Sequence, residues 1–391
     1  MLPYCRHNNK DDDTGGEECK GEYCRRFHDV VTNEFHHIDF PEAFGKTCRG
    51  GGFGWLAFTQ ETPSGFLINP TTRQQIDLPP ITTLPGVLSY RPNRAGFEYV
   101  RQDVSFSDGE VYRVGESGSW MAHSYVNKIV MSTDPTRKDC CVVMGLFESC
   151  LGGLALCRPG LDTKWTTVVG STSCYTDAVF WRDQFYAVDC LGNVDVISYN
   201  PGDGLPTKSR WLSTLRDYRY LGVNDHYLVE NPSGELMLVH RNKDWRDCEG
   251  PDFPPQEREE LHFDGEEDTT YVAFHGSKAR LDLYETAAFK VFKLNTDAHD
   301  WERVDSVGED YALFLGGNRA SFVSAGDYPG CRANCIYFTD DYNEGQEADC
   351  DGGYDVGVYD IGRGSVEPFH CRSLYDPVLI WPPPVWVFPC E

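Results

Sequence analysis

Apolar residues along this chain come in short runs that turn-forming residues separate. One arrangement recurs: an apolar run reaches a turn built from Asn, Asp or Arg-Pro, and a Trp or a Leu-Pro follows shortly afterwards. It is found in FLINPTTRQQIDLPP (66–80), LALCRPGLDTKWTTV (154–168), VDVISYNPGDGLPTKSRWLSTL (194–215), FKVFKLNTDAHDWERV (289–304) and, in a degraded form, VGVYDIGRGSVEPF (356–369). This pattern predicts short β-strands joined by tight turns.

Further apolar runs lie between these repeats, and we expect them to be partner strands. They are GWLAF (54–58), CCVVMGLF (140–147), AVFWRDQFYAVD (178–189), YALFLGG (311–317) and CIYFTDD (335–341). The segment HYLVENPSGELMLVHR (226–241) predicts a hairpin around residues 232–234.

The spacing of the repeats indicates a propeller. The starts at Phe66, Leu154, Val194 and Phe289 are 88, 40 and 95 residues apart. These intervals approximate two, one and two units of about 40–47 residues, the length of a four-stranded propeller blade. The last interval, 67 residues, requires an insertion. We therefore predict an all-β fold, a β-propeller of six or seven four-stranded blades, in preference to a sandwich.

Three segments fall outside the repeats. Residues 1–34 are polar and acidic, without periodicity, and are expected to form a disordered or loosely ordered tail. The propeller then covers residues 35–391, with an acidic insertion at about 243–282 that we expect to be a mobile surface loop. The apolar C-terminal stretch VLIWPPPVWVFPCE is expected to supply a strand that closes the ring of blades.

Composition and charge limit the classes of partner. Of the 391 residues, 40% are hydrophobic, which suffices for a large core, and 38 glycines and 23 prolines agree with frequent turns. The formal net charge is −26, from 61 acidic and 35 basic residues. Such a surface repels phosphate backbones and anionic lipids, which argues against nucleic-acid and membrane partners. Protein partners remain.

The cysteines indicate a reducing compartment. Several of the 16 lie inside apolar runs, among them Cys140, Cys141, Cys157 and Cys190, where a reduced cysteine behaves as a small hydrophobic residue. The N-terminal MLPYCRHNNKDDD does not resemble a signal peptide, and no run approaches the roughly 18 apolar residues of a membrane span. We expect the cytoplasm or the nucleus.

Candidate metal and redox sites are weak. In DYPGCRANCIYFTDDY (327–342), Cys331 and Cys335 lack the C-x2-C spacing of zinc or thioredoxin motifs, and Cys335 opens a strand, so we assign them to packing. Nearby carboxylates fit a calcium loop only loosely, and we expect solvated strand-end carboxylates: Asp340, Asp341, Asp349 and Asp351. An irregular set in the tail is expected to be exposed rather than zinc-bound: Cys5, His7, Cys19, Cys24 and His28.

No catalytic motif is present. The chain has no G-x-S-x-G, and GKTCRGGGFG (45–54) lacks the upstream glycine of a P-loop and precedes a strand. The repeats show no polar residue at a fixed blade position, as an active site assembled in a central channel would need. We therefore expect no catalytic residues, no cofactor and no metal. The alternative is a propeller enzyme with a central-channel active site, a glycan hydrolase or lyase.

Five blocks follow one another along the chain: GWLAF…FLINPTTRQQIDLPPI, DCCVVMG…LALCRPG…KWTTV, DAVFWRDQFYAVDCLGNVDV, FKVFKLN…WERVDSVGEDYALFLGGN and YPGCRANCIYFTDDY…VGVYD…VEPF…PPPVW. Together they resemble plant F-box-associated proteins of the KIB-type β-propeller family, long catalogued as a plant domain of unknown function. The resemblance covers about residues 35–389. It implies a kelch-like propeller that binds a client protein. In many family members an N-terminal F-box docks on the Skp adaptor of a cullin ubiquitin ligase, so the propeller is a substrate receptor and not a catalyst.

The chain departs from that arrangement at its N-terminal end. An F-box needs about 40 residues of amphipathic helix, and residues 1–34 are too polar and too rich in glycine and acidic residues. We expect no F-box here, which argues against recruitment of the Skp adaptor and the cullin ligase. The expected function is that of a non-catalytic protein-binding propeller with unknown clients; a truncated member without activity is a further alternative.

Overall fold

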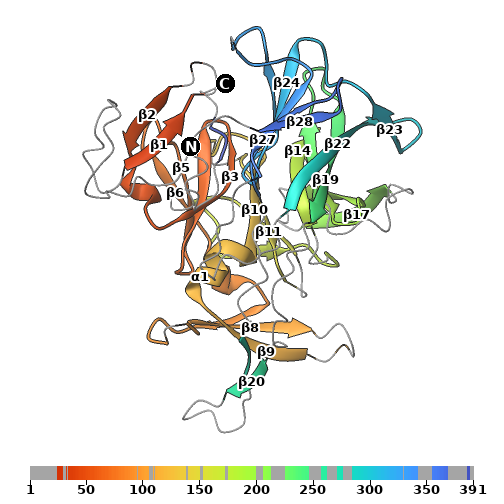
Figure 1. The fold of residues 1–391 in the computed structure, drawn as a ribbon. Helices are drawn as coiled ribbons and strands as arrows, with labels where there is room; N and C mark the ends of the chain where they lie inside the picture. Colours follow the sequence, from red (N-terminus) through yellow and green to blue (C-terminus); the bar gives the residue numbers. More distant parts are fainter. Residues whose placement is uncertain are drawn as a thin grey trace.

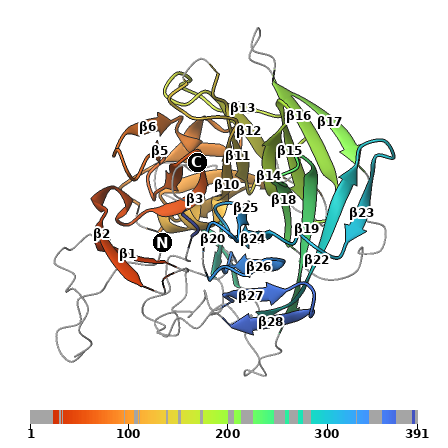
Figure 2. The same ribbon diagram turned by 90° about the horizontal axis from the view of Figure 1, so that it is seen from above.

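The computed structural model describes residues 24–29, 32, 34–94, 96–104, 109, 111–137, 140–149, 153–171, 175–199, 206–212, 225–245, 257–261, 271–275, 284–328, 330–341, 355–368 and 385–387. Seen from above, small sheets radiate from a common centre (Figure 2). This arrangement is a β-propeller, and it confirms the predicted all-β fold class. No helix in these ranges is long and apolar enough to cross a membrane.

Four blades have four strands each, in order from the centre outward. The first contains β3 (Thr47–Gly52), β4 (Trp55–Thr59), β5 (Gly65–Ile68) and β6 (Gln75–Leu78), and the second contains β10 (Val126–Met131), β11 (Val143–Phe147), β12 (Leu154–Cys157) and β13 (Thr166–Thr167). Their innermost strands β3 and β10 also pair in parallel at Gly50 and Ile129, which joins these two blades in one eight-stranded sheet. The third contains β14 (Tyr175–Trp181), β15 (Gln184–Asp189), β16 (Val194–Tyr199) and β17 (Pro206–Leu212). The fourth contains β18 (Asp225–Glu230), β19 (Leu236–Trp245), β22 (Tyr284–Asn295) and β23 (Asp300–Val304).

A fifth blade has one strand more. Its order is β25 (Ser321–Ser324), β24 (Tyr311–Leu315), β26 (Cys335–Phe338), β27 (Gly357–Asp360) and β28 (Ser365–Pro368), and β24 and β26 run parallel. The described ranges contain these five blades, so the predicted number of six or seven stays a prediction.

The repeated sequence pattern marks the outer hairpin of each blade. The hairpins are β5–β6, β12–β13, β16–β17, β22–β23 and β27–β28. The interpretation of the two long intervals was wrong, however. Each contains one blade boundary and an inserted segment rather than two repeat units, because β7–β9 precede β10 and β20–β21 precede β22.

One predicted partner strand is in fact a hairpin. The run 178–189 divides into β14 and β15 at Arg182 and Asp183, whose φ angles are +47° and +63°. Two consecutive residues with positive φ form the type of turn that matches the twist of paired strands. The hairpin predicted around residues 232–234 is confirmed as β18–β19.

The two inserted segments form a sheet of their own at the bottom of Figure 1. Its order is β20 (Glu257–Leu261), β21 (Tyr271–His275), β9 (Val111–Glu116), β8 (Tyr99–Val104) and β7 (Val87–Tyr90). Strands β9 and β21 are parallel neighbours, although β9 lies between the first and second blades and β21 lies between β19 and β22 of the fourth. The acidic insertion, expected as a surface loop, therefore contains two paired strands. We call this five-stranded sheet the insertion sheet.

Short helical turns and a hairpin complete the described elements. The turns are η1 (Pro41–Ala43), η2 (Ile81–Thr83), α1 (Gly118–Trp120) and the π-helical η3 (Met121–Tyr125). The hairpin pairs β1 (Cys24–His28) with β2 (Phe35–Asp39). The end of the expected tail thus forms a strand, while residues 1–23 lie outside the described ranges.

The apolar core lies between neighbouring blades. Leu156 of the second blade and Ile197 of the third share one cluster, and Val196 and Leu238 connect the third blade to the fourth in the same way. Each blade therefore buries both faces of its sheet, as a layered β-fold requires.

The C-terminal segment joins the last described blade to the first. The Trp386 indole Nε1 donates a hydrogen bond to the Leu315 carbonyl at 2.7 Å, and its ring packs edge-on against Phe314. The Asn318 side chain donates to the Trp386 carbonyl at 2.8 Å. Val387 packs against the first-blade cluster that contains Phe58. Residues 385–387 thus span the seam as expected, but through side chains and loop contacts rather than as a strand.

Candidate functional site

Buried polar side chains occupy the same position in four innermost strands. The third residue of β3, β10, β14 and β18 is Arg49, Lys128, Asp177 and Tyr227, respectively, and none of the four is more than 6% exposed. In β3, β10 and β14 the register shifts beside this residue. A bulge re-aims a side chain that would otherwise follow the pleat. The expectation that no polar residue recurs at a fixed blade position was therefore wrong.

Asp177 connects three blades. Its carboxylate forms an ion pair with the Lys128 ammonium group of the second blade and accepts a hydrogen bond from the Leu228 amide of the fourth at 2.9 Å. It also accepts from the amide of Ala178 in its own strand at 2.7 Å. Burial raises the pKa of Asp177, and the charge of Lys128 opposes this effect. A fully buried carboxylate is tolerated only with such partners.

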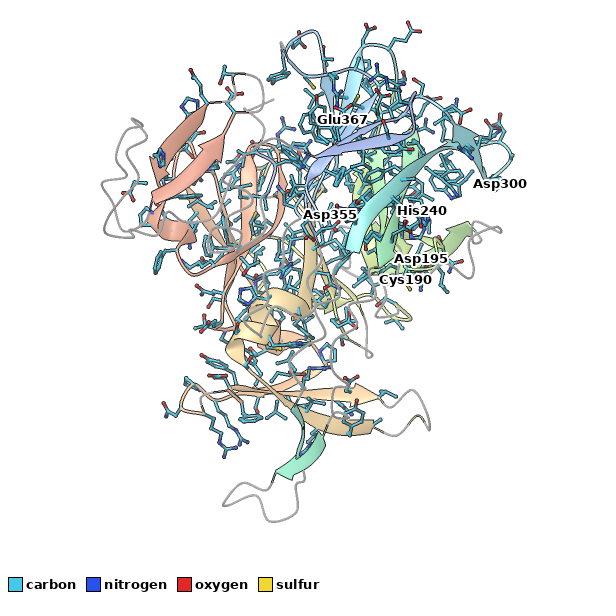
Figure 3. The ribbon with its side chains drawn as sticks, in the orientation of Figure 1. Cys190, Asp195, His240, Asp300, Asp355 and Glu367 are labelled. Carbon is cyan, nitrogen blue, oxygen red and sulfur yellow. The ribbon has the colours of Figure 1, made fainter. Side chains whose placement is uncertain are left out.

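Arg241 of β19 lies between the fourth and fifth blades and is fully buried. Its guanidinium carbon lies 4.9 Å from the centre of the Phe338 ring and 5.8 Å from that of Phe289. Its NH1 donates to Asp341 Oδ1 at 3.0 Å, and its NH2 donates to Asp355 Oδ2 at 2.9 Å. Four further acceptors complete the set, namely Thr286 Oγ1, Tyr227 OH and the carbonyls of Thr339 and Asp355. Figure 3 shows Asp355 in the middle of the molecule.

Lys243 extends this group of charges along β19. Its ammonium group forms ion pairs with Asp225 and Asp341. Burial lowers the pKa of Lys243, but the two carboxylates outweigh burial and raise it above the usual value. Burial likewise raises the pKa of Asp341, but Arg241 and Lys243 outweigh it and hold that pKa below its usual range. Both groups are therefore ionised at neutral pH.

Two buried histidines lie on the opposite face of the same strands. His226 of β18 and His240 of β19 are register partners, and His226 Nε2 lies 3.2 Å from His240 Nδ1. Burial, with a contribution from His240, lowers the pKa of His226 to about 3. Burial and the nearby Lys290 charge lower the pKa of His240 to about 4. The pair is thus neutral at physiological pH.

The arrangement pairs opposite charges instead of presenting a reactive group. We call the set Lys128, Asp177, Asp225, Tyr227, Arg241, Lys243, Asp341 and Asp355 the central charge network. Three cationic side chains face four carboxylates, and each carboxylate has a cationic partner inside the protein. Within the described ranges, no group of three or more His, Cys, Asp or Glu side chains could hold a metal ion.

The structure tests some of the candidate metal and redox residues named from the sequence, and others lie outside the described ranges. Cys335 opens β26 and is 2% exposed, and Cys331 packs against the same apolar cluster, so their assignment to packing is confirmed. Burial raises the pKa of both thiols, which keeps them protonated. Asp349 and Asp351 lie outside the described ranges, as do Cys5, His7, Cys19 and the side chains of Cys24 and His28.

The expectation for the aspartates after β26 was wrong. Asp340 is 6% exposed, and the side chain of Asp341 is 10% exposed and paired with Arg241 and Lys243. Both are buried rather than solvated: Asp341 is an ion-pair partner, and Asp340 accepts a hydrogen bond from the Asp355 amide at 3.4 Å. The signal in the sequence was LMLVHRNK (236–243), an apolar strand in which Arg241 and Lys243 occupy alternate positions and so face the same side.

The comparisons with known proteins agree with this fold. The family model named KIB1-4 beta-propeller matches residues 27–360, most of the chain. The chain belongs to this family. That finding confirms the resemblance to plant F-box-associated KIB-type propellers.

Its curated relatives are F-box proteins. F-box protein SKIP23 of Arabidopsis thaliana is 28% identical over 238 residues, which cover 60% of this chain and 51% of that protein. The probable F-box protein At4g22165 of the same plant is 22% identical over 371 residues, 93% of this chain and 79% of the relative. The chain spans about half the length of the first of these. The β-propeller domain of Cps50 (Swd1) from Myceliophteria thermophila is a solved structure with a TM-score of 0.30 and 11% identity, covering 83% of this chain and 84% of that one.

Proposed function

We propose that this KIB1-4 propeller binds client proteins as the recognition domain of a plant F-box-type ubiquitin-ligase receptor, and that it catalyses no reaction. The observation that carries the proposal is the family match over residues 27–360, together with relatives that are F-box proteins. In such a receptor, the propeller holds the client and other subunits perform the chemistry.

The central charge network supports the non-catalytic part of the proposal. A general acid or base must reach a substrate atom with a free proton or lone pair. Asp341 is engaged by Arg241, Lys243 and Tyr227, and Asp177 by Lys128 and two amides. Charges that are occupied in this way stabilise the contacts between blades and are not available to a substrate.

The net charge of −26 supports a preference among clients. A negative surface accelerates encounters with positively charged proteins and slows those with negative ones. We therefore expect clients with a basic binding surface, and an association rate that falls as ionic strength rises.

Affinity purification of the tagged chain from plant tissue, followed by quantitative mass spectrometry, tests the proposal. The matched control is an unrelated propeller of similar negative charge, which removes proteins held by charge alone. Specific, saturable binding of a recovered protein to the purified chain is the expected result. If no protein binds the chain more tightly than the control, the client-binding function is wrong.

Three further experiments address adaptor binding, catalysis and localisation. The purified chain is mixed with a purified Skp adaptor, and saturable binding would show that this chain itself recruits the adaptor. Measurable turnover on a panel of glycans would contradict the non-catalytic assignment. A fluorescent fusion expressed in leaf cells should lie in the cytoplasm or nucleus.

A further inference from the structure

Phe53 has an unusual backbone conformation. Six non-glycine residues of the described ranges have positive φ, and Phe53, at +53°, is the one with an apolar side chain. The other five are polar or charged: Arg73, Arg182, Asp183, His299 and Asn334. Positive φ is uncommon outside glycine, and Asn, Asp and His tolerate it best, whereas for a bulky residue it is strained.

The turn that contains Phe53 prefers other residues. Gly52 and Trp55 are register partners, so Phe53 and Gly54 alone connect β3 to β4. With φ angles of +53° and +76°, both have the left-handed backbone of a two-residue turn that favours Asn-Gly. Asparagine at position 53 would therefore relieve strain.

Phe53 takes no part in the apolar core of the described residues that could offset this strain. Phe53 is 47% exposed and belongs to none of the apolar clusters of the described residues, and glycines flank it on both sides. Phe44 provides a direct comparison, because it is also 47% exposed but has a relaxed φ of −64°. A single exposed phenylalanine is ordinary on a protein surface. Phe53 differs from Phe44 because its exposed ring is combined with a strained backbone.

The strand that leads to Phe53 is held rigidly. A side chain at Gly50 would place its Cβ 2.1 Å from the Ile129 carbonyl oxygen, so β3 lies directly against β10. A Cβ added at Gly52 would lie 3.7 Å from the end of the Met131 side chain, which is ordinary van der Waals contact. A rigid base lowers the entropy that a side chain loses when it is captured by a partner.

The strand register shows at which end of the first blade Phe53 lies. Thr47 pairs with Thr59, which pairs with Gly65, which pairs with Leu78, so these residues share one end of the first blade. The insertion sheet follows β6 at that end, and the Phe53 turn is at the other. Phe53 is thus presented at the mouth of the propeller opposite to the insertion sheet.

From this geometry we infer that Phe53 is an anchor residue, which inserts its ring into an apolar pocket on a partner protein. The inference rests on the proposed client-binding function and adds the contact through which a client is held. Aromatic side chains that are presented rigidly and buried on binding contribute a large share of the affinity at protein interfaces. The strain in the free chain is then offset by burial in the complex.

A stability measurement provides the first test. The variants Phe53→Asn and Phe44→Asn are compared with the wild-type chain in thermal unfolding. We expect Phe53→Asn to raise the midpoint by roughly 1 °C, because it removes strain without losing a core contact. We expect Phe44→Asn not to raise it. A lower midpoint for Phe53→Asn would show that the ring stabilises the fold, and would overturn the inference.

A binding measurement provides the second test. A photoreactive p-benzoylphenylalanine at position 53, and at position 44 as the control, is used to crosslink partners in plant extract, and the affinity of a recovered partner is then measured. We expect a loss of at least tenfold for Phe53→Asn and less than threefold for Phe44→Asn. Equal affinity of Phe53→Asn and wild type, or no product at position 53, overturns the anchor. Clients that bind both variants normally would still support the proposed function.

Discussion

Replacing Arg241 by methionine is expected to destabilise the propeller strongly. Methionine fills much of the same volume between Phe289 and Phe338, so the change removes charge and hydrogen bonds more than packing. It leaves Asp355 without its guanidinium partner and takes one of two cations from Asp341. Loss of one member of a buried ion pair costs about 3–5 kcal/mol, since an uncompensated charge remains.

The effect is measurable as a shift in melting temperature. For a chain of 391 residues the entropy of unfolding is roughly 0.8 kcal/mol per degree, so the expected loss corresponds to about 4–6 °C. The control is Arg158→Met, which breaks the exposed Arg158–Asp162 pair in the second blade. An exposed pair contributes below about 1 kcal/mol, and its loss should shift the melting temperature by about 1 °C or less.

A combined variant tests whether unpaired charge is the cause. Together with Arg241→Met, the changes Asp341→Leu and Asp355→Leu remove the stranded carboxylates. Much of the lost stability should return, because a buried ionic group can often be replaced as a whole by apolar residues. If Arg241→Met melts within about 1 °C of the wild type, the central charge network does not stabilise the fold as described.

Three other perturbations follow from the structure. Gly50→Ala places a Cβ against the Ile129 carbonyl oxygen and should lower the melting temperature by several degrees, more than Gly52→Ala in the same strand, whose Cβ would meet only the Met131 side chain at 3.7 Å, as differential scanning fluorimetry would show. Trp386→Ala removes the contacts that hold the C-terminal segment on the last described blade, which weakens the link that Val387 makes to the first, and hydrogen exchange should then rise first at β3, β4 and β24; exchange that rises evenly over all blades would contradict a local seam. The pKa values of about 3 for His226 and about 4 for His240 lie below the unfolded value of about 6.5, so the unfolded chain binds more protons and the free energy of unfolding falls as pH drops below about 6.5. Chemical denaturation should show a loss of up to about 4 kcal/mol between pH 7 and pH 5. A variant with asparagine at both positions should lose less.

The outer hairpins could be predicted from the sequence because their signals are local. A run such as FLINPTTRQQIDL contains both strands and the turn between them, so no distant contact is needed to recognise it. The RD turn at Arg182 and Asp183 lacked a glycine or asparagine, and the hairpin there was taken for one strand. This turn needs positive φ at Arg182 and Asp183, and nothing in the sequence there predicts that conformation.

The central charge network was missed because its partners are far apart in the chain. Arg241 and Asp341 are separated by 100 residues, and Arg241 and Asp355 by 114. Hydrophobic periodicity identifies which side of a strand is buried, but does not indicate which buried charges meet. The same reason applies to the insertion sheet, where the parallel pairing of β9 and β21 joins two inserted segments that are far apart in the chain.

Buried charge also distinguishes one contact between blades from another. The apolar clusters between successive blades contain Val and Leu side chains beside their aromatic rings, and such aliphatic side chains could pack against more than one neighbour. A buried ion is stable only opposite its own partner. Asp177 reaches the second and fourth blades from the third, and Arg241 reaches the fifth from the fourth, so each contact has its own pairing. The combined variant should therefore recover melting temperature but lose discrimination between alternative blade contacts, which broadened NMR resonances of the fourth and fifth blades would reveal.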